Sequence, residues 1–141
     1  MDSSTFKVIL AGDGGVGKTS LVKRWIFNEW GPKYISTLGT EHYDMMLNTH
    51  YGPIKLSLWD CAGQEKLGEI KEDYYLGANG ALLVFDVTSK LSYRSLPDWD
   101  RSIQRVCDGI PTVVVGTKND IADRKLHASD ITFPNSRGYH Y

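Results

Sequence analysis

Gly12-Asp13-Gly14-Gly15-Val16-Gly17-Lys18-Thr19 follows directly on the apolar run at residues 6–11. The spacing G-x-x-x-x-G-K-T between a strand and a helix is typical of a phosphate-binding loop, whose glycines let main-chain N–H groups turn toward phosphate oxygens. In such a loop Lys18 can reach the terminal phosphates, and the Thr19 hydroxyl can hold Mg²⁺. The segment therefore predicts a nucleoside triphosphate ligand, but it leaves open which nucleotide binds and whether it is hydrolysed, transferred or only held.

The composition indicates a single domain outside the secretory pathway. The chain has 141 residues, with 16 Lys plus Arg against 17 Asp plus Glu and a net charge of -1, so no broad basic field calls for nucleic acid. The first residues lack a basic start and an apolar stretch, and no run approaches the roughly 18 apolar residues of a membrane span. Cys61 and Cys107 form no metal-binding or lipidation motif. We expect a soluble protein with reduced thiols, no membrane anchor and no direct contact with nucleic acid.

Hydrophobic periodicity predicts an α/β fold with a doubly wound, mostly parallel sheet and one antiparallel hairpin strand. Polar and glycine-rich turns separate short apolar runs, and two of these runs are continuous, as in parallel strands covered on both faces. The predicted order is strand 6–10, helix 18–27, hairpin strands 42–48 and 54–60, a helix, strand 81–85, helix 93–106 and strand 112–115. Pro97 is expected to place the firm start of the helix at 93–106 near Asp98. Ligands of such sheets bind at the carboxyl ends of the strands.

Two further segments follow strands and bear on the ligand. Asp60 ends the third strand, where its carboxylate can hold the water shell of Mg²⁺. On spacing alone, the less favoured alternative is a turn former at the end of the strand. Gly63 can present its N–H to the terminal phosphate, and Gln64 can orient an attacking water. After the last strand, Asp120 could accept the two N–H donors of guanine that adenine lacks, while the stem of Lys118 packs along the base. Alone, this pair is equally compatible with a solvated turn.

Taken together, these segments resemble the Ras superfamily of small GTPases, and most closely its Ran branch. The resemblance runs from about residue 6 to residue 141 and is carried by the segments at residues 12–15, 37–39, 52–55, 59–60, 62–66, 85–89 and 123–125. It implies a P-loop NTPase with three α/β/α layers that binds GTP, GDP and Mg²⁺ and hydrolyses GTP slowly unless stimulated. It further implies a role in nucleocytoplasmic transport of proteins and RNA, in the nucleus and cytoplasm. The implied partners are a GTPase-activating protein, an exchange factor and nuclear transport receptors.

The resemblance assigns roles residue by residue. Thr37 is similar to the first-switch threonine that joins Thr19 and Asp60 on Mg²⁺, with Thr40 as its rival, and Gln64 acts in catalysis with Lys18 and Thr37. Without the resemblance, Trp30 and Tyr34 would be read as packing aromatics. The residues implied to contact nucleotide are Asp13, Gly14, Gly15, Val16, Gly17, Lys18, Thr19, Ser20, Trp30, Gly31, Lys33, Tyr34, Thr37, Gly63, Thr117, Lys118 and Asp120.

The chain departs from the family pattern in two places. Thr117 stands where the guanine motif usually begins with Asn, and we expect guanine preference to survive this change. Residues 131–141 stop where the family begins its sixth strand, so the last strand and helix of the family are missing from this single domain of residues 1–141. We therefore expect a bare apolar edge beside residues 113–115, a partly uncovered sheet face, and weak guanine affinity or poor solubility.

Two other functions remain to be weighed against the switch. A truncated, non-cycling interaction module with the GTPase fold would keep the fold with weak or no nucleotide turnover. A nucleotide kinase or an ATPase would share only the phosphate loop, and the segments around Gln64 and Asp120 argue against it.

Overall fold

The computed structural model describes residues 4–14, 16–25, 41–60, 74–118 and 124–141. In these ranges the chain forms β1 (Ser4–Ala11), α1 (Lys18–Trp25), β2 (Glu41–Thr49), β3 (Gly52–Asp60), β4 (Gly80–Asp86), α2 (Lys90–Arg94), α3 (Leu96–Val106), β5 (Thr112–Thr117), a 3₁₀ turn (Ala128–Asp130) and α4 (Phe133–Arg137). No helix in these ranges has the length and apolar character needed to cross a bilayer.

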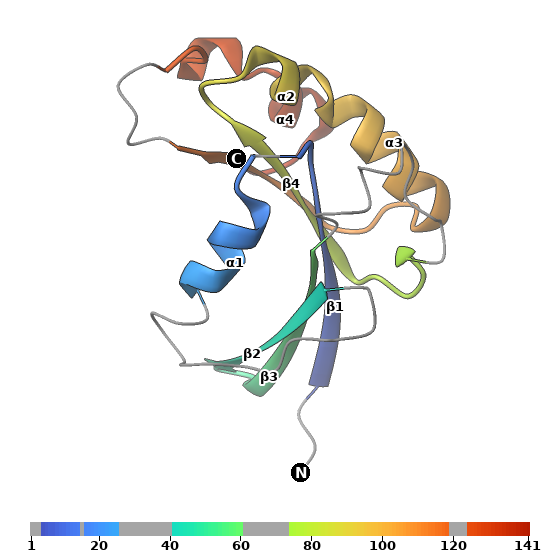
Figure 1. Cartoon of the computed structure of the whole chain (residues 1–141). Coiled ribbons are helices and arrows are strands. Elements are labelled where there is room, and N and C mark those ends of the chain that lie inside the picture. The colour runs from blue at the N-terminus through green and yellow to red at the C-terminus, as the bar shows by residue number, and fades with distance from the viewer. Residues whose placement is uncertain (1–3, 15, 26–40, 61–73, 119–123) are drawn as a thin grey trace.

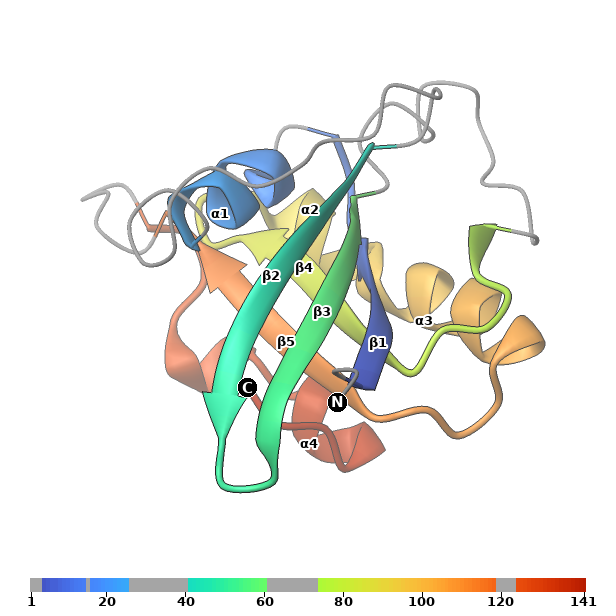
Figure 2. The ribbon, with the colours of Figure 1, turned by 90° about the horizontal axis from the view of Figure 1, so that it is seen from below.

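The five described strands form one twisted sheet in the order β2-β3-β1-β4-β5, and all five are labelled in Figure 2. β1 is parallel to both β3 and β4, and β4 is parallel to β5, while β2 and β3 pair antiparallel. The predicted fold class, a mostly parallel α/β sheet with one antiparallel hairpin, is therefore confirmed. The hairpin runs in register from Glu41 opposite Asp60 to Thr49 opposite Gly52, with His50 and Tyr51 at its tip.

Successive side chains of β1 point to opposite faces of the sheet, and each face has its own hydrophobic cluster. Ile9 and Ala11 pack on one face with α3 residues such as Ile103, whereas Leu10 packs on the other face with Val22 of α1. Figure 1 accordingly shows α1 on one side of the sheet and α2, α3 and α4 on the other, which gives the three layers expected. On the α1 face, the partly buried side chains are Val8, Leu47, Leu56 and Leu82.

The helical segment between β4 and β5 differs from its sequence prediction. Instead of one helix with a firm start near Asp98, α2 ends at Arg94 and α3 begins at Leu96. Pro97 lies in the first turn of α3, where its missing N–H costs nothing, so the helix starts before the proline. Ser89 caps α2 by accepting a hydrogen bond from the Ser92 N–H at 3.2 Å.

The expected bare edge of β5 is also corrected by the structure. The main-chain N–H of Val114 donates to the carbonyl oxygen of His140 at 2.8 Å, and Val113 forms a parallel bridge with His140. The Tyr141 ring then stacks on Phe85, with 6.0 Å between ring centroids. Residues 140–141 thus pair with part of the edge because a main-chain donor and an aromatic contact are available there.

A hydrogen-bond network fixes this returning segment to α3. The carboxylate of Asp100, only 4% exposed, accepts from the Tyr139 hydroxyl at 2.7 Å and from Arg137 Nε at 3.1 Å. Gln104 Nε2 lies 3.3 Å from the same hydroxyl. Burial, followed by the hydrogen bond to Asp100, raises the pKa of Tyr139 above its usual value of 10.0. The network therefore satisfies a buried carboxylate and favours the neutral phenol.

Replacing Tyr139 by Phe should lower the free energy of unfolding by about 1 to 3 kcal/mol at pH 7, because Asp100 loses a hydrogen bond inside a buried site. The raised pKa of Tyr139 contributes stability that is present below the unfolded pKa near 10.0 and is lost as pH rises through the folded value. Urea unfolding at pH 7 and in an alkaline series measures both effects. Tyr51→Phe, at a side chain that is 92% exposed, is the matched control. Equal stability of the two variants at pH 7 would contradict the role of the network.

Candidate functional site

The carboxyl ends of β1, β3 and β5 bring the predicted site residues to one edge of the sheet. Leu10 of β1 pairs with Asp60 at the end of β3, and Asp86 at the end of β4 pairs with Thr117. The loop at residues 12–17 leaves β1 at this edge and leads into α1 (Figure 1). The described parts of the predicted segments therefore lie together at the carboxyl ends of neighbouring strands.

Two glycines give the loop its close fit to the sheet. At Gly12, an added Cβ would overlap the main-chain oxygen of Val84 in β4. Gly17 has a φ of +95°, a left-handed value that side chains disfavour, and the Leu21 N–H donates to its carbonyl at 2.9 Å as α1 begins. The loop can therefore approach β4 closely and turn into the helix only with glycine at these positions.

Lys18 carries its charge into this loop. The residue is 3% exposed, and its ammonium donates to the carbonyl oxygens of Gly12 at 2.5 Å and Asp13 at 3.0 Å. A buried ammonium must be hydrogen-bonded, and a positive charge at the start of a helix favours an anionic ligand. Lys18 thus lies where a phosphate-binding lysine is needed.

The other described loop residues surround this ammonium in different ways. Gly14 and Ser20 are exposed, Val16 is buried, and Thr19 lies in the first turn of α1. The carboxylate of Asp13 accepts from the Ser95 hydroxyl at 2.8 Å and from the Trp99 indole N–H at 3.0 Å. The predicted contact of Asp13 with nucleotide therefore concerns its main chain, because its side chain is engaged by α3.

Thr117 links the phosphate loop to the sheet. Its hydroxyl makes a short hydrogen bond to the Val16 carbonyl and lies 3.0 Å from the carbonyl oxygen of Phe85. A hydroxyl has one hydrogen and can satisfy one of these acceptors at a time. The residue that departs from the family pattern therefore connects the phosphate loop with β4 and β5, a role that the sequence analysis did not assign.

Lys118 follows Thr117 in a left-handed conformation with φ of +61°. Its ammonium lies 2.8 Å from Asp86 Oδ2, while Asp86 Oδ1 accepts from the N–H of Thr88 at 2.8 Å and from its hydroxyl at 2.6 Å. Burial raises the pKa of Asp86, but the hydrogen bonds from Lys118 and Thr88 outweigh it and the pKa lies below 3.8. Asp86, which the sequence analysis did not single out, holds Lys118 beside the end of β5. The sequence signal that could have identified Asp86 is its position at the end of a predicted strand, two residues before Thr88.

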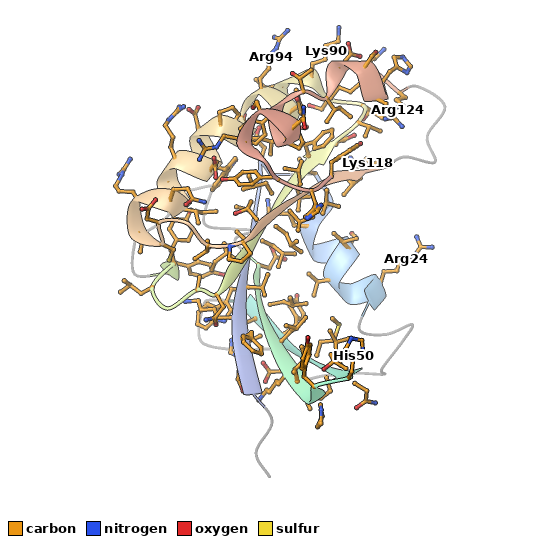
Figure 3. All side chains as sticks on the ribbon, turned by 180° about the vertical axis from the view of Figure 1, so that it is seen from behind. Arg24, His50, Lys90, Arg94, Lys118 and Arg124 are labelled. Carbon is orange, nitrogen blue, oxygen red and sulfur yellow. The ribbon has the colours of Figure 1, made fainter. Side chains whose placement is uncertain are left out.

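A cavity of about 640 Å³ lies between α1 and the end of β5. This volume is in the range of small-molecule sites. Arg24 and Lys118 bring positive charge to it, and Figure 3 shows both on the same side of the sheet. Its lining includes the predicted residues Gly17, Ser20, Thr117 and Lys118, together with Leu21, Arg24 and Gly116. The cavity continues from the phosphate loop to the predicted base-binding segment, which is the path that a nucleotide requires.

Asp60 provides the described part of the predicted metal site. It is 1% exposed at the end of β3, beside β1, and its carbonyl accepts from the Tyr74 hydroxyl at 2.7 Å. Within the described ranges no three His, Cys, Asp or Glu side chains gather as a metal site. The predicted set of Asp60 with hydroxyls from Thr19 and Thr37 needs no such cluster, and its oxygen atoms suit Mg²⁺. The chemistry of this donor set therefore fits the ion.

Several predicted residues lie outside the described residues, and their assignments stay predictions. They are Gly15, Trp30, Gly31, Lys33, Tyr34, Thr37, Thr40, Gly63, Gln64 and Asp120.

The described geometry defines a nucleotide-binding protein with a phosphate loop at the edge of an α/β sheet. The model of the Ras family matches residues 7–137, and the chain belongs to this family. Members of the Ras family are GTP-binding switches that hydrolyse GTP and bind GTP or GDP with Mg²⁺, under the control of regulators.

Replacing Thr117 by Val should weaken GDP binding roughly tenfold, because the Val16 carbonyl loses its donor and the loop loses its link to β5. The dissociation constant measured by titration calorimetry checks this. Thr112→Val is the matched control, since Thr112 lies on the same strand and its hydroxyl lies 3.1 Å from the Ile110 carbonyl, away from the loop. Equal GDP affinities in the two variants would show that the Thr117 hydroxyl does not support the nucleotide site.

Proposed function

We propose that this protein is a Ran-type GTP-binding switch that hydrolyses GTP to GDP in nucleocytoplasmic transport, with residence in the nucleus and cytoplasm. Two observations carry the nucleotide part: the buried Lys18 ammonium in the phosphate loop, and the cavity that reaches from Gly17 at the end of that loop to Lys118. The transport part rests on the Ran-like segments of the sequence, from residues 12–15 to residues 123–125.

In this proposal hydrolysis is an in-line attack of water on the γ-phosphate. Lys18 and the main-chain N–H groups of residues 14–19 stabilise negative charge on the transferring group, and Gln64 orients the water. Asp60, Thr19 and Thr37 would hold Mg²⁺, and the ion would supply positive charge that neutralises phosphate oxygens. Because the loop is fixed to β4 and β5 before the reaction, its donors need little reorganisation.

Switching follows from contacts that depend on the γ-phosphate. Thr37 and Gly63 lose their partner when the phosphate leaves, so the surfaces around them differ between the GTP and GDP states. The proposed partners read this difference: a GTPase-activating protein, an exchange factor and nuclear transport receptors. Neither a membrane anchor nor direct nucleic-acid contact is part of the proposal. The alternative of a truncated, non-cycling module is not favoured by the match to the Ras family.

Replacing Gln64 by Leu should lower activator-stimulated GTP hydrolysis by at least about 100-fold, because the attacking water is no longer oriented. Affinity for GTP and GDP should change less than about threefold, since Gln64 acts on the water rather than on the bound nucleotide. Single-turnover phosphate release and nucleotide titration measure the two quantities on the same preparation. Competition of labelled GDP by ATP adds a specificity control. Unchanged hydrolysis in the variant would contradict the assignment of Gln64.

The transport role predicts that nuclear transport receptors bind the GTP-loaded chain and not the GDP-loaded chain. The physical reason is that the γ-phosphate orders the surface which the receptor contacts. Purified receptors of the importin type can be titrated with each nucleotide state of Gln64→Leu, whose slow hydrolysis preserves the loaded nucleotide. Binding that is absent in both states, or equal in both, would contradict the Ran-type role and leave the GTPase assignment in place.

A further inference from the structure

Asp13 places a carboxylate inside the phosphate loop, where a negative charge opposes the binding of phosphate. Its side chain faces α3: Asp13 Oδ2 accepts from the Ser95 hydroxyl at 2.8 Å, and Oδ1 accepts from the Trp99 indole N–H at 3.0 Å. Both donors come from a segment more than 80 positions away in the sequence, with separations of 82 and 86 residues. The Ser95 hydroxyl also lies 3.0 Å from the Leu91 carbonyl oxygen and can serve one acceptor at a time, and the carboxylate is the stronger acceptor. The contacts with Ser95 and Trp99 therefore hold the charge toward α3.

The two donors share one face because of the local helix geometry. Ser95 is the junction of α2 and α3, and Trp99 follows four residues later, one helical turn along. The main-chain N–H of Trp99 donates to the Ser95 carbonyl oxygen at 3.2 Å. The Trp99 ring packs against the core cluster that contains Ile103. Trp99 is therefore held by the core, and its indole N–H is presented to the loop. Figure 1 shows the α2–α3 junction beside the end of β1, where the loop begins.

The main chain of Asp13 contacts the phosphate-loop lysine. Its carbonyl oxygen accepts from Lys18 Nζ at 3.0 Å, so the ammonium lies next to the residue whose carboxylate points to α3. A different χ1 rotamer would turn that carboxylate from α3 toward the ammonium and the phosphate position. There it would attract the lysine that a phosphate needs and repel the phosphate itself.

We propose that Ser95 and Trp99 are positioning residues of the phosphate site, which hold the Asp13 carboxylate toward α3 so that Lys18 pairs with phosphate. The inference rests on the phosphate end of the proposed function and adds residues that act through Asp13 rather than on the ligand. We call the group of Asp13, Ser95 and Trp99 the carboxylate clamp. If the clamp acts through the charge of Asp13, then neutralising Asp13 should restore the phosphate binding that is lost when the donors of Ser95 and Trp99 are removed.

The test compares four forms of the full chain: wild type, D13N, S95A/W99F and S95A/W99F/D13N. Dissociation constants are measured for GDP and, separately, for inorganic pyrophosphate. S95A/W99F should bind both probes roughly tenfold more weakly, and the loss should shrink as salt rises. D13N alone should stay within about threefold of wild type, because Asn retains an acceptor for Trp99. Adding D13N to S95A/W99F should restore binding to within about threefold of wild type, because the released side chain is then neutral.

Controls separate this effect from a general loss of structure. Asp98→Asn removes an exposed carboxylate from the same helix, one that pairs with Arg101 outside the loop, and should leave both affinities unchanged. The single variant W99F replaces the double variant if S95A/W99F does not unfold cooperatively. The Trp99 indole N–H resonance provides a readout without ligand: it should move upfield in D13A, which removes its acceptor, and little in D13N.

The outcomes are distinct for the two proposals. If S95A/W99F/D13N binds as weakly as S95A/W99F, or more weakly, the clamp only supports the loop backbone and the inference is overturned. If wild type binds pyrophosphate but not GDP, the GTP-binding function fails, while the pyrophosphate series still decides the role of the clamp. A wild type that binds neither probe overturns both.

Discussion

The buried ammonium of Lys18 is the constraint on which the site depends. A charge that is 3% exposed has to be hydrogen-bonded, and the described acceptors include the carbonyls of Gly12 and Asp13. These carbonyls can face inward only if the loop bends back closely over β4, which is why a side chain at position 12 would overlap Val84. The glycines, the strand beneath them and the direction of Asp13 are thus consequences of placing one positive charge where phosphate binds.

The sheet supplies the rigid reference for that charge. The carboxyl end of β1 is buried on both faces, with Ile9 and Leu10 fully enclosed in different clusters, so the start of the loop cannot shift without disrupting packing on both sides. The loop is then attached at two further points, through Thr117 to β5 and through Asp13 to α3. Both attachments come from the part of the chain that follows β4 in the sequence. The phosphate loop is therefore in direct hydrogen-bond contact with β5 and with the start of α3.

The sequence was sufficient to predict those features that repeat locally. The phosphate loop, the continuous apolar strands and the hairpin each have a period or spacing that is set by backbone geometry, and the structure confirms them. Two predictions were wrong. The helix was expected to start near Asp98 but starts at Leu96, because a helix can begin before a proline. The edge of β5 was expected to be bare, but the Val114 N–H pairs with the His140 carbonyl, because a main-chain donor pairs with a nearby acceptor. Asp86, Ser95 and Trp99 were missed because their partners are distant in the sequence, and no periodicity records a contact between residues 13 and 99. Roles predicted for Gln64, Thr37 and Asp120 remain predictions on residues outside the described ranges.

Thr117, where the family usually has Asn, changes how the phosphate loop and β4 are hydrogen-bonded to the end of β5. An Asn side chain carries two N–H donors and could serve two carbonyls at once, whereas the Thr117 hydroxyl carries one hydrogen and faces the carbonyls of both Val16 and Phe85. Only one of these oxygens can be satisfied by this hydroxyl at a time, so the loop and β4 compete for the same proton. The Thr117 hydroxyl therefore leaves one of the two carbonyls without a donor from this side chain, which an Asn in the same position need not do.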